Sequence, residues 1–301
     1  LHRRRHSFPT RRSSDLQIDL RPEALGNRCP LQLGLLGDVK LTLEAVLPKV
    51  MQNPDRDHLD QALDDYKKAR EDLDALAESG PGSSIIHPQY LNRLVSELAA
   101  EDAIFTCDVG TPTAWAARYL KMNGKRRLIG SFNHGSMANA MLQAIGAQAT
   151  YPDRQVISMS GDGGFTMMMG DFLTLSQVGL PVKVIVLNNG TLGFVEMEMK
   201  AAGFPDVGCD LKNPNFAAMA QAMGVKGIRV EHPSELEAAL REAFAHDGPV
   251  LVDVVSARQE LVMPPTKTFE QAKGFSLFML KTVMDGRARE LIDLAKVNLW
   301  R

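Results

Sequence analysis

One acidic residue and a pair of asparagines have the chemistry to bind a metal ion together. Asp162 lies in the run Gly-Asp-Gly-Gly at residues 161–164, and Asn-Asn-Gly-Thr follows at 188–191. Carboxylate and amide oxygens are ligands that Mg²⁺ prefers, and phosphate oxygens and water usually complete its octahedron. The glycines let backbone N–H groups approach phosphates, and a helix after them would present its positive end. These residues predict a site for a metal-bridged diphosphate.

The elements around these residues predict that they meet. Residues 156–159 read as a buried strand, residues 172–178 as a helix with one apolar face, and residues 182–187 as a central strand. A right-handed crossover makes the two strands parallel, so Asp162 and Asn189 would emerge at the same edge of the sheet. A Gly-Asp-Gly alone is also a common turn. The prediction therefore depends on the whole βαβ arrangement.

A second glycine-rich turn and a long alternation of elements extend this pattern. Residues 108–113 follow a predicted strand and offer a further phosphate contact, although turn chemistry alone explains them equally well. Strands and helices alternate from 104 to 255, and a helix at 234–245 has the residues of a capping box, Ser234 and Glu237. We therefore predict an α/β fold with a doubly wound, mostly parallel sheet flanked by helices.

The order strand, Gly-Asp-Gly, helix, strand, Asn-Asn resembles the signature of the thiamine-diphosphate-dependent enzymes. The resemblance implies that Mg²⁺ is bound by Asp162, Asn189 and the backbone carbonyl of Thr191. It also implies cofactor contacts from three segments, formed by Gly135, Ser136 and Met137, by Asp162, Gly163 and Gly164, and by Asn189, Gly190, Thr191, Leu192, Gly193, Phe194 and Val195.

Three apolar residues have an implied role beside the cofactor. By resemblance, Met137 props thiamine diphosphate into a bent shape, whereas a Met elsewhere is more often core filler. Phe194 and Val195 would line the active centre, and Phe194 is a candidate catalytic contact. The apolar residues of 192–199 could instead simply pack the loop down, with Glu196, Glu198 and Lys200 as a solvated face.

Composition limits the other functional classes. The chain has 301 residues, 45% of them hydrophobic, and a formal charge of −2, which gives no argument for binding nucleic acid. Three widely spaced cysteines suggest neither a disulfide framework nor a zinc site. A reducing cytoplasm fits best, and no apolar run reaches the roughly 18 residues of a membrane-spanning helix.

The two ends of the chain differ from the middle. Residues 1–16 carry five arginines without an apolar period, and 8–16 resemble a translated sequencing adapter, so we expect them to be non-native; a basic nucleic-acid arm is the alternative. We predict that 17–50 are the remnant of a truncated central domain with a strand that lacks its partners, 51–84 a linker, 85–259 the thiamine-diphosphate domain, and 260–301 a tail.

The tail contains an amphipathic segment. Leu291, Leu294, Ala295 and Asn298 share one helical stripe, and Trp300 follows at the tip. Such a helix could lie in a lipid interface, or the stripe could dock on its own protein.

This tail is similar to that of the flavin-bearing, quinone-reducing branch of the family. Near the other end of the chain, Asp19 and Asp38 match positions of the FAD domain in that branch. The resemblance implies oxidative decarboxylation of pyruvate to acetate and CO₂, with electrons passing through FAD to ubiquinone, in a homotetramer bound peripherally to the inner face of the cell membrane. Acetolactate synthase, an oxygen-using pyruvate oxidase and a non-catalytic cofactor-binding module are the alternatives. The glutamate that activates the cofactor in this family lies in a domain that we cannot match here, so we expect this chain to be inactive alone.

Overall fold

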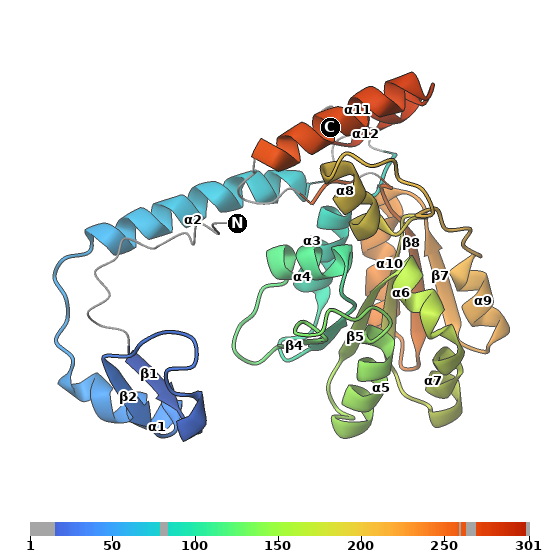
Figure 1. Cartoon of the computed structure of the whole chain (residues 1–301). Helices are drawn as coiled ribbons and strands as arrows, with labels where there is room; N and C mark the ends of the chain where they lie inside the picture. Colours follow the sequence, from blue (N-terminus) through green and yellow to red (C-terminus); the bar gives the residue numbers. More distant parts are fainter. Residues whose placement is uncertain (1–15, 79–83, 259, 263–268, 299–301) are drawn as a thin grey trace. The chain divides into compact units, whose positions relative to one another are not determined.

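The computed structural model describes residues 16–78, 84–258, 260–262 and 269–298, and it divides the chain into two compact units, Leu1–Lys67 and Lys68–Arg301 (Figure 1). Most of the segment predicted to be non-native, and Trp300 at the tip of the tail, lie outside the described residues.

The first unit contains a small parallel sheet. Strand β1 (Leu16–Asp19) pairs with β2 (Leu33–Leu36), so the expectation of a strand without partners was wrong. Leu16, which we had assigned to the non-native segment, is the first residue of β1 and pairs with Leu33. The short helices are η1 (Pro22–Ala24), α1 (Val39–Val46) and η2 (Leu47–Lys49), and Asp38 caps α1 by accepting a hydrogen bond from the N–H of Leu41 at 2.9 Å.

The second unit is built on a six-stranded parallel sheet, which confirms the predicted fold class. Its strands are β3 (Ile104–Cys107), β4 (Arg127–Gly130), β5 (Val156–Gly161), β6 (Lys183–Asn188), β7 (Lys226–Val230) and β8 (Val250–Val255), in the order β4-β3-β5-β6-β8-β7. After β4 the chain crosses to the other side of β3, where β5 begins. The carboxyl ends of β3 and β5 therefore flank a topological switch point, where open α/β sheets bind ligands.

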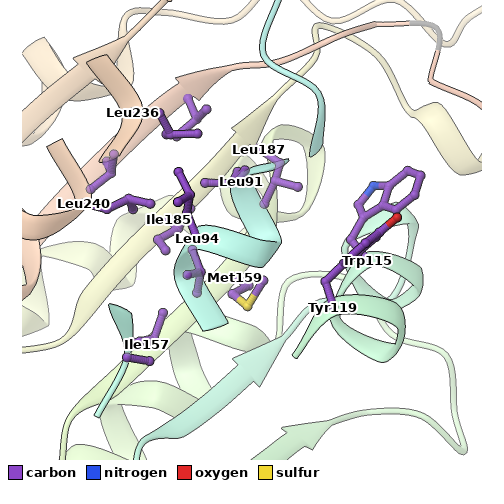
Figure 2. Packing of buried hydrophobic residues seen from close by; sticks show 14 of the residues in the cluster. Leu91, Leu94, Trp115, Tyr119, Ile157, Met159, Ile185, Leu187, Leu236 and Leu240 are labelled. Atoms are coloured by element: carbon purple, nitrogen blue, oxygen red, sulfur yellow. The ribbon is translucent and has the colours of Figure 1, made fainter. Parts of the chain in front are cut away.

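Helices cover both faces of this sheet (Figure 1). The core on one face includes residues of α3 (Pro88–Leu98), α4 (Thr111–Tyr119) and α10 (Pro233–Ala245), and the core on the other includes residues of α5 (Ala140–Thr150), α7 (Phe172–Val178) and α9 (Phe216–Ala222). Adjacent strand residues alternate between the two cores, because successive side chains point to opposite faces of a sheet. Figure 2 shows the first core, where Leu91, Trp115 and Leu236 from the helices gather around Met159 and Ile185 from the strands.

The second core contains a group of aromatic rings. Phe165 meets Phe172 and Phe216 edge to face, with ring centroids 5.8 and 5.5 Å apart. This geometry is the favourable one for aromatic pairs. It fixes α6 (Asp162–Met167), the short helix that carries Phe165, to two neighbouring helices.

The other elements of the chain are α2 (Asp57–Leu76), which crosses the boundary between the units, η3 (Met169–Asp171), α8 (Gly193–Ala201), α11 (Phe269–Met284) and α12 (Ala288–Asn298). The predicted capping box was wrong. Helix α10 begins at Pro233, one residue before Ser234, and no side chain caps it. In the part of the chain that the structure describes, we find no helix whose length and apolar character would let it cross a bilayer.

The amphipathic stripe of α12 packs against the protein. Leu294 of the stripe is buried, as is Val297 beside it, and the Asn298 side chain accepts a hydrogen bond from the N–H of Leu261 at 3.0 Å. Ile292 on another side of the helix is exposed. Of the two alternatives for this stripe, the structure therefore displays docking on its own chain.

Candidate metal and diphosphate site

A cavity of about 50 Å³ lies where β3, β5 and β6 end. Its walls are Asp108, Val109, Gly110, Thr111, Pro112, Met137, Gly161, Asp162, Gly163, Gly164, Leu187, Asn189, Thr191, Leu192, Gly193, Phe194 and Val195.

Asp162 is the charged group at the centre of this edge. It is 2% exposed, and its Oδ1 accepts a hydrogen bond from the N–H of Gly163 at 2.8 Å. Its Oδ2 accepts from the N–H of Gly190 and from the amide of Asn213, both at 2.7 Å. Burial raises the pKa of Asp162, and these hydrogen bonds oppose the shift only in part. The ionised carboxylate is therefore costly in the free chain, and a bound cation would offset that cost.

Asn189 and Thr191 follow β6 at the same edge. The Asn189 side-chain oxygen accepts the N–H of Thr191 at 3.2 Å, and the Thr191 carbonyl accepts the N–H of Gly193 at 2.9 Å. Gly190 between them has a φ of 69°, a conformation that costs glycine little. Gly190 does not line the cavity, but its N–H fixes Asp162.

The donor set fits a hard divalent cation. A carboxylate has about four lone pairs and a carbonyl or amide oxygen has two, so the hydrogen bonds of Asp162, Asn189 and Thr191 leave each a place for a further partner. Among the described residues, no group of three or more His, Cys, Asp or Glu could hold a metal. The Asp162 carboxylate and the neutral oxygens of Asn189 and Thr191 match the pattern of a Mg²⁺ ion that takes further oxygens from phosphate and water.

Asn213 was missed by the sequence reasoning. Its amide donates to Asp162 and also to the side-chain oxygen of Asn188 at 2.9 Å, while the Asn188 amide donates to Asp253 at 2.9 Å. Asp253 is fully buried and pairs with Arg229 at 2.6 Å. Asn188 and Asn213 thus connect the Asp162 carboxylate to the ion pair of the buried Asp253 with the partly exposed Arg229. Asn213 lies in a loop with no periodic pattern or motif that would have singled it out.

Asp108 fixes the start of α5 beneath the cavity. Its Oδ1 accepts hydrogen bonds from the N–H groups of Asn139 and Ala140 at 2.7 and 2.8 Å. Burial raises the pKa of Asp108 despite the hydrogen bonds it accepts. A Cβ on Gly164 would lie 2.4 Å from Asp108 Oδ2, so only glycine lets the loop approach this carboxylate. The predicted 108–113 turn lines the cavity from Asp108 to Pro112.

The predicted loop at 135–137 contributes one wall. Met137 lines the cavity, and its Cε lies 3.4 Å from where a Cβ of Gly163 would stand. Gly135 and Ser136 do not line it. The Ser136 carbonyl accepts a hydrogen bond from the Asn139 amide at 2.6 Å, which fixes the loop before α5. The structure thus brings Met137 to the metal edge and leaves Gly135 exposed.

Helix α8 presents two apolar side chains and hides two charged ones. Phe194 and Val195 line the cavity and are 39% and 45% exposed, so both are accessible to a ligand. Glu196 and Lys200 are each 3% exposed and form an ion pair, so the alternative of a solvated charged face was wrong for them. Their i,i+4 spacing was the available sequence signal. Glu198 is exposed, as that alternative expected.

Comparison with known proteins identifies the domain that carries this edge. Residues 108–254 match the family model of the thiamine pyrophosphate enzyme, C-terminal TPP binding domain; thiamine pyrophosphate is another name for thiamine diphosphate. The matched segment begins at Asp108 and ends within β8, so it contains every wall of the cavity.

The chain is similar to proteins that carry three different functional names. The chain is 35% identical over 93% of its length to YdaP of Bacillus subtilis, provisionally described as thiamine pyrophosphate-containing. It is 31% identical over 87% of its length to the acetolactate synthase large subunit of Porphyra purpurea, and 32% identical over 80% to the pyruvate oxidase of Lactiplantibacillus plantarum. The chain spans 48%, 45% and 40% of these three proteins, about half of each or less.

Proposed function

We propose that this chain supplies the metal- and diphosphate-binding half of a thiamine-diphosphate-dependent enzyme that acts on pyruvate. The match of residues 108–254 to the C-terminal TPP-binding domain supports this proposal. The observation that carries the proposal is the convergence of Asp162, Asn189 and Thr191 on one cavity, each with an oxygen able to accept a further partner. The chemistry of these donors and the family of the domain support the same ligand.

Each residue has a defined task in this proposal. Asp162, Asn189 and the carbonyl of Thr191 hold Mg²⁺, and the glycines at 163 and 164 leave space for the diphosphate. Met137 and the exposed Phe194 and Val195, which line the cavity, would contact the cofactor. The cofactor itself, when bound, would supply a nucleophilic carbon to attack the keto group and a cationic ring to take up the electron pair left by decarboxylation.

For the whole protein we propose oxidation of pyruvate to acetate and CO₂, with FAD and ubiquinone as electron acceptors. The pyruvate oxidase relative supports pyruvate as the substrate. The proposal includes a homotetramer at the inner face of the membrane. Because the α12 stripe is docked in this structure, contact between that stripe and lipid would require α12 to leave its site.

Acetolactate synthase is the second candidate, since relatives of that name are 31% identical over most of the chain. The full-length gene product, incubated with pyruvate, thiamine diphosphate, Mg²⁺, FAD and a soluble ubiquinone analogue, distinguishes the two. Acetate with stoichiometric quinone reduction supports the first proposal. Acetolactate without quinone reduction refutes it and supports the second.

The metal assignment has its own test by calorimetry of thiamine diphosphate binding to the full-length protein with and without Mg²⁺. We expect Asp162→Ala to abolish the Mg²⁺-dependent part of the binding, because the site loses the carboxylate proposed to bind the ion. Asp153→Ala, on an exposed turn, is the matched control and should bind as the wild type does. Equal affinity of Asp162→Ala and the control would contradict the assignment.

A further inference from the structure

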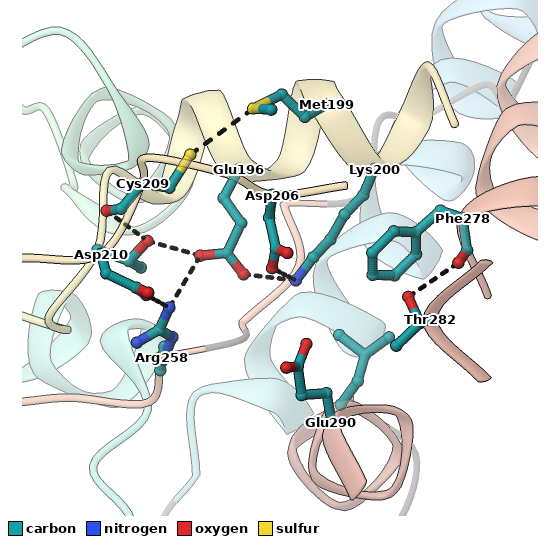
Figure 3. A network of polar contacts seen from close by, with 12 residues as sticks. Glu196, Met199, Lys200, Asp206, Cys209, Asp210, Arg258, Phe278, Thr282 and Glu290 are labelled. Atoms are coloured by element: carbon teal, nitrogen blue, oxygen red, sulfur yellow. Dashed lines mark hydrogen bonds and ion pairs between the residues drawn. The ribbon is translucent and has the colours of Figure 1, made fainter. Parts of the chain in front are cut away.

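A chain of buried charges runs from α8 toward the C-terminal helices (Figure 3). Lys200 forms an ion pair with Glu196, one turn earlier on α8, and its Nζ lies 3.7 Å from Asp206 Oδ2. Asp206 in turn pairs with Arg287 at 2.6 Å, at the turn between α11 and α12. Burial alone would raise the pKa of Asp206, but the hydrogen bond from Arg287 and the charge of Lys200 outweigh it and lower that pKa.

Such a network is expensive to bury. Removing charged groups from water costs several kcal/mol per ion, which their attraction repays only with good geometry. Glu196 and Lys200 are each 3% exposed, so both charges of this ion pair are removed from water. Apolar side chains could serve a purely stabilising role. We therefore expect the carboxylate of Glu196 to have a further task besides neutralising Lys200.

The second carboxylate oxygen of Glu196 contacts the side chain of Thr191. Glu196 Oε2 lies 2.6 Å from the hydroxyl of Thr191, which also lies 3.1 Å from the carbonyl of Cys209. A hydroxyl has one hydrogen to donate. The Glu196 carboxylate makes the shorter of the two contacts, and a carboxylate is a stronger acceptor than a carbonyl oxygen. The hydroxyl of Thr191 therefore donates to Glu196. The Cys209 carbonyl instead accepts the N–H of Leu192 at 2.9 Å.

Thr191 is the residue of the metal loop whose backbone is expected to bind the ion. It is 2% exposed, and its own N–H and carbonyl are engaged with Asn189 and Gly193 on the loop itself. Outside the loop, the adjacent Gly190 carbonyl accepts from Leu211 N at 2.9 Å. Because the Thr191 side chain and carbonyl share one Cα, fixing the hydroxyl restricts the direction of the carbonyl.

We propose that Glu196 is the positioning residue of the metal loop: through the hydroxyl of Thr191 it holds the Thr191 carbonyl toward the ion, and Lys200 holds Glu196 in place. This inference rests on the proposed function, because it presumes a divalent cation at Asp162. Asp206 and Arg287 anchor Lys200 from the other side. Glu196 itself does not line the cavity, so it acts on the site only through Thr191.

Amide hydrogen exchange of the 301-residue chain, without metal, tests the contact directly. We expect Thr191→Val, which keeps the shape and removes the hydroxyl, to raise the exchange rates of residues 190–193 at least tenfold. Thr191→Ser, which retains the hydroxyl, should restore the wild-type rates. Glu196→Gln retains an acceptor and should give an intermediate rate. Arg241→Ala, which breaks an exposed i,i+4 ion pair with Glu237 on α10, is the control and should leave 190–193 unchanged.

Titration of the same variants with Mn²⁺ in the presence of thiamine diphosphate, followed by electron paramagnetic resonance of the full-length protein, tests the consequence. Weaker Mn²⁺ binding in Thr191→Val that Thr191→Ser restores supports the proposal, and a merely structural role would not give that rescue. Unchanged exchange at 190–193 in Thr191→Val would overturn the positioning role even if wild type binds Mn²⁺. Absence of Mn²⁺ binding by the wild type would instead overturn the proposed function, and with it the metal role of Glu196.

Discussion

Replacement of Gly164 by alanine is the sharpest test of how the site is packed. The new Cβ would stand 2.4 Å from Asp108 Oδ2 and 3.1 Å from Asp108 Cγ. Real carbon atoms do not approach an oxygen that closely, so one of the two groups must move. The Asp108 carboxylate cannot swing away freely, because its other oxygen accepts two N–H groups at the start of α5 at 2.7 and 2.8 Å.

The magnitude follows from these contacts. Overpacking a well-packed site costs about 1–3 kcal/mol, and loss of a side-chain cap costs roughly 1 kcal/mol more. We therefore expect Gly164→Ala to lower the free energy of unfolding by about 2–4 kcal/mol, a large part of the typical 5–15 kcal/mol of a domain. Gly146 on α5 is the matched control, since a Cβ there would meet no atom within 4 Å. Gly146→Ala should stabilise the chain by about 0.5–1 kcal/mol.

Urea denaturation followed by circular dichroism measures both effects, provided that the slope with denaturant is unchanged. A double-mutant cycle with Asp108→Ala assigns the cause. In the Asp108→Ala background the obstructing carboxylate is gone, so Gly164→Ala should cost less than about 1 kcal/mol. Equal stability of Gly164→Ala and the wild type, or the same cost in both backgrounds, would refute the account of the Asp108 contact.

Two further predictions concern the C-terminal helices. The folded-state pKa of Asp206 is lowered, so the stability that its carboxylate contributes is complete above the unfolded pKa of about 3.9 and is lost as the pH falls through the lower folded value. In urea titrations at several pH values, wild type should exceed Asp206→Asn in stability by a constant amount above about pH 5 and by less below about pH 4; a constant difference throughout would contradict this. A Cβ on Gly274 would lie 2.0 Å from a backbone carbonyl of α8. Gly274→Ala should therefore destabilise the packing of α11 by about 1–3 kcal/mol and speed its amide exchange. Ser276→Ala on the same helix should do neither, and equal exchange rates in the two variants would disprove the close contact.

The sequence alone was sufficient to predict the sheet and the meeting of Asp162 and Asn189 at one edge of it. Period-two apolar strands and period-3.6 helices are local patterns, and the handedness of βαβ crossovers is nearly invariant. Those two facts bring Asp162 and Asn189 to one edge, and the structure places both on the same cavity. The parallel sheet and its flanking helices are confirmed for the same reason.

The contacts between loops could not be predicted in this way. Asn213 lies far along the chain from Asp162, and the i,i+4 spacing of Glu196 and Lys200 predicts an ion pair without indicating whether that pair is buried or faces water. Which loop residue reaches a buried carboxylate depends on how the loops after β6 pack against each other, and no periodic pattern encodes that packing. The pairing of β1 with β2 was missed similarly, because a short strand takes its partner from the tertiary structure.

The sequence by itself therefore determined the donor chemistry at this edge of the sheet, since residue types and βαβ handedness are local properties of the chain. Only the tertiary structure decided how that chemistry is supported: Asn213 and Gly190 on the Asp162 carboxylate, Asp108 beneath Gly164, and Glu196 on the Thr191 hydroxyl. The contacts of Asp162 and of Asp108 join segments that come together only when the sheet has formed, so no short stretch of sequence specifies them. Glu196 lies only five residues after Thr191, and there the packing of the folded domain decided that its side chain is buried against the hydroxyl.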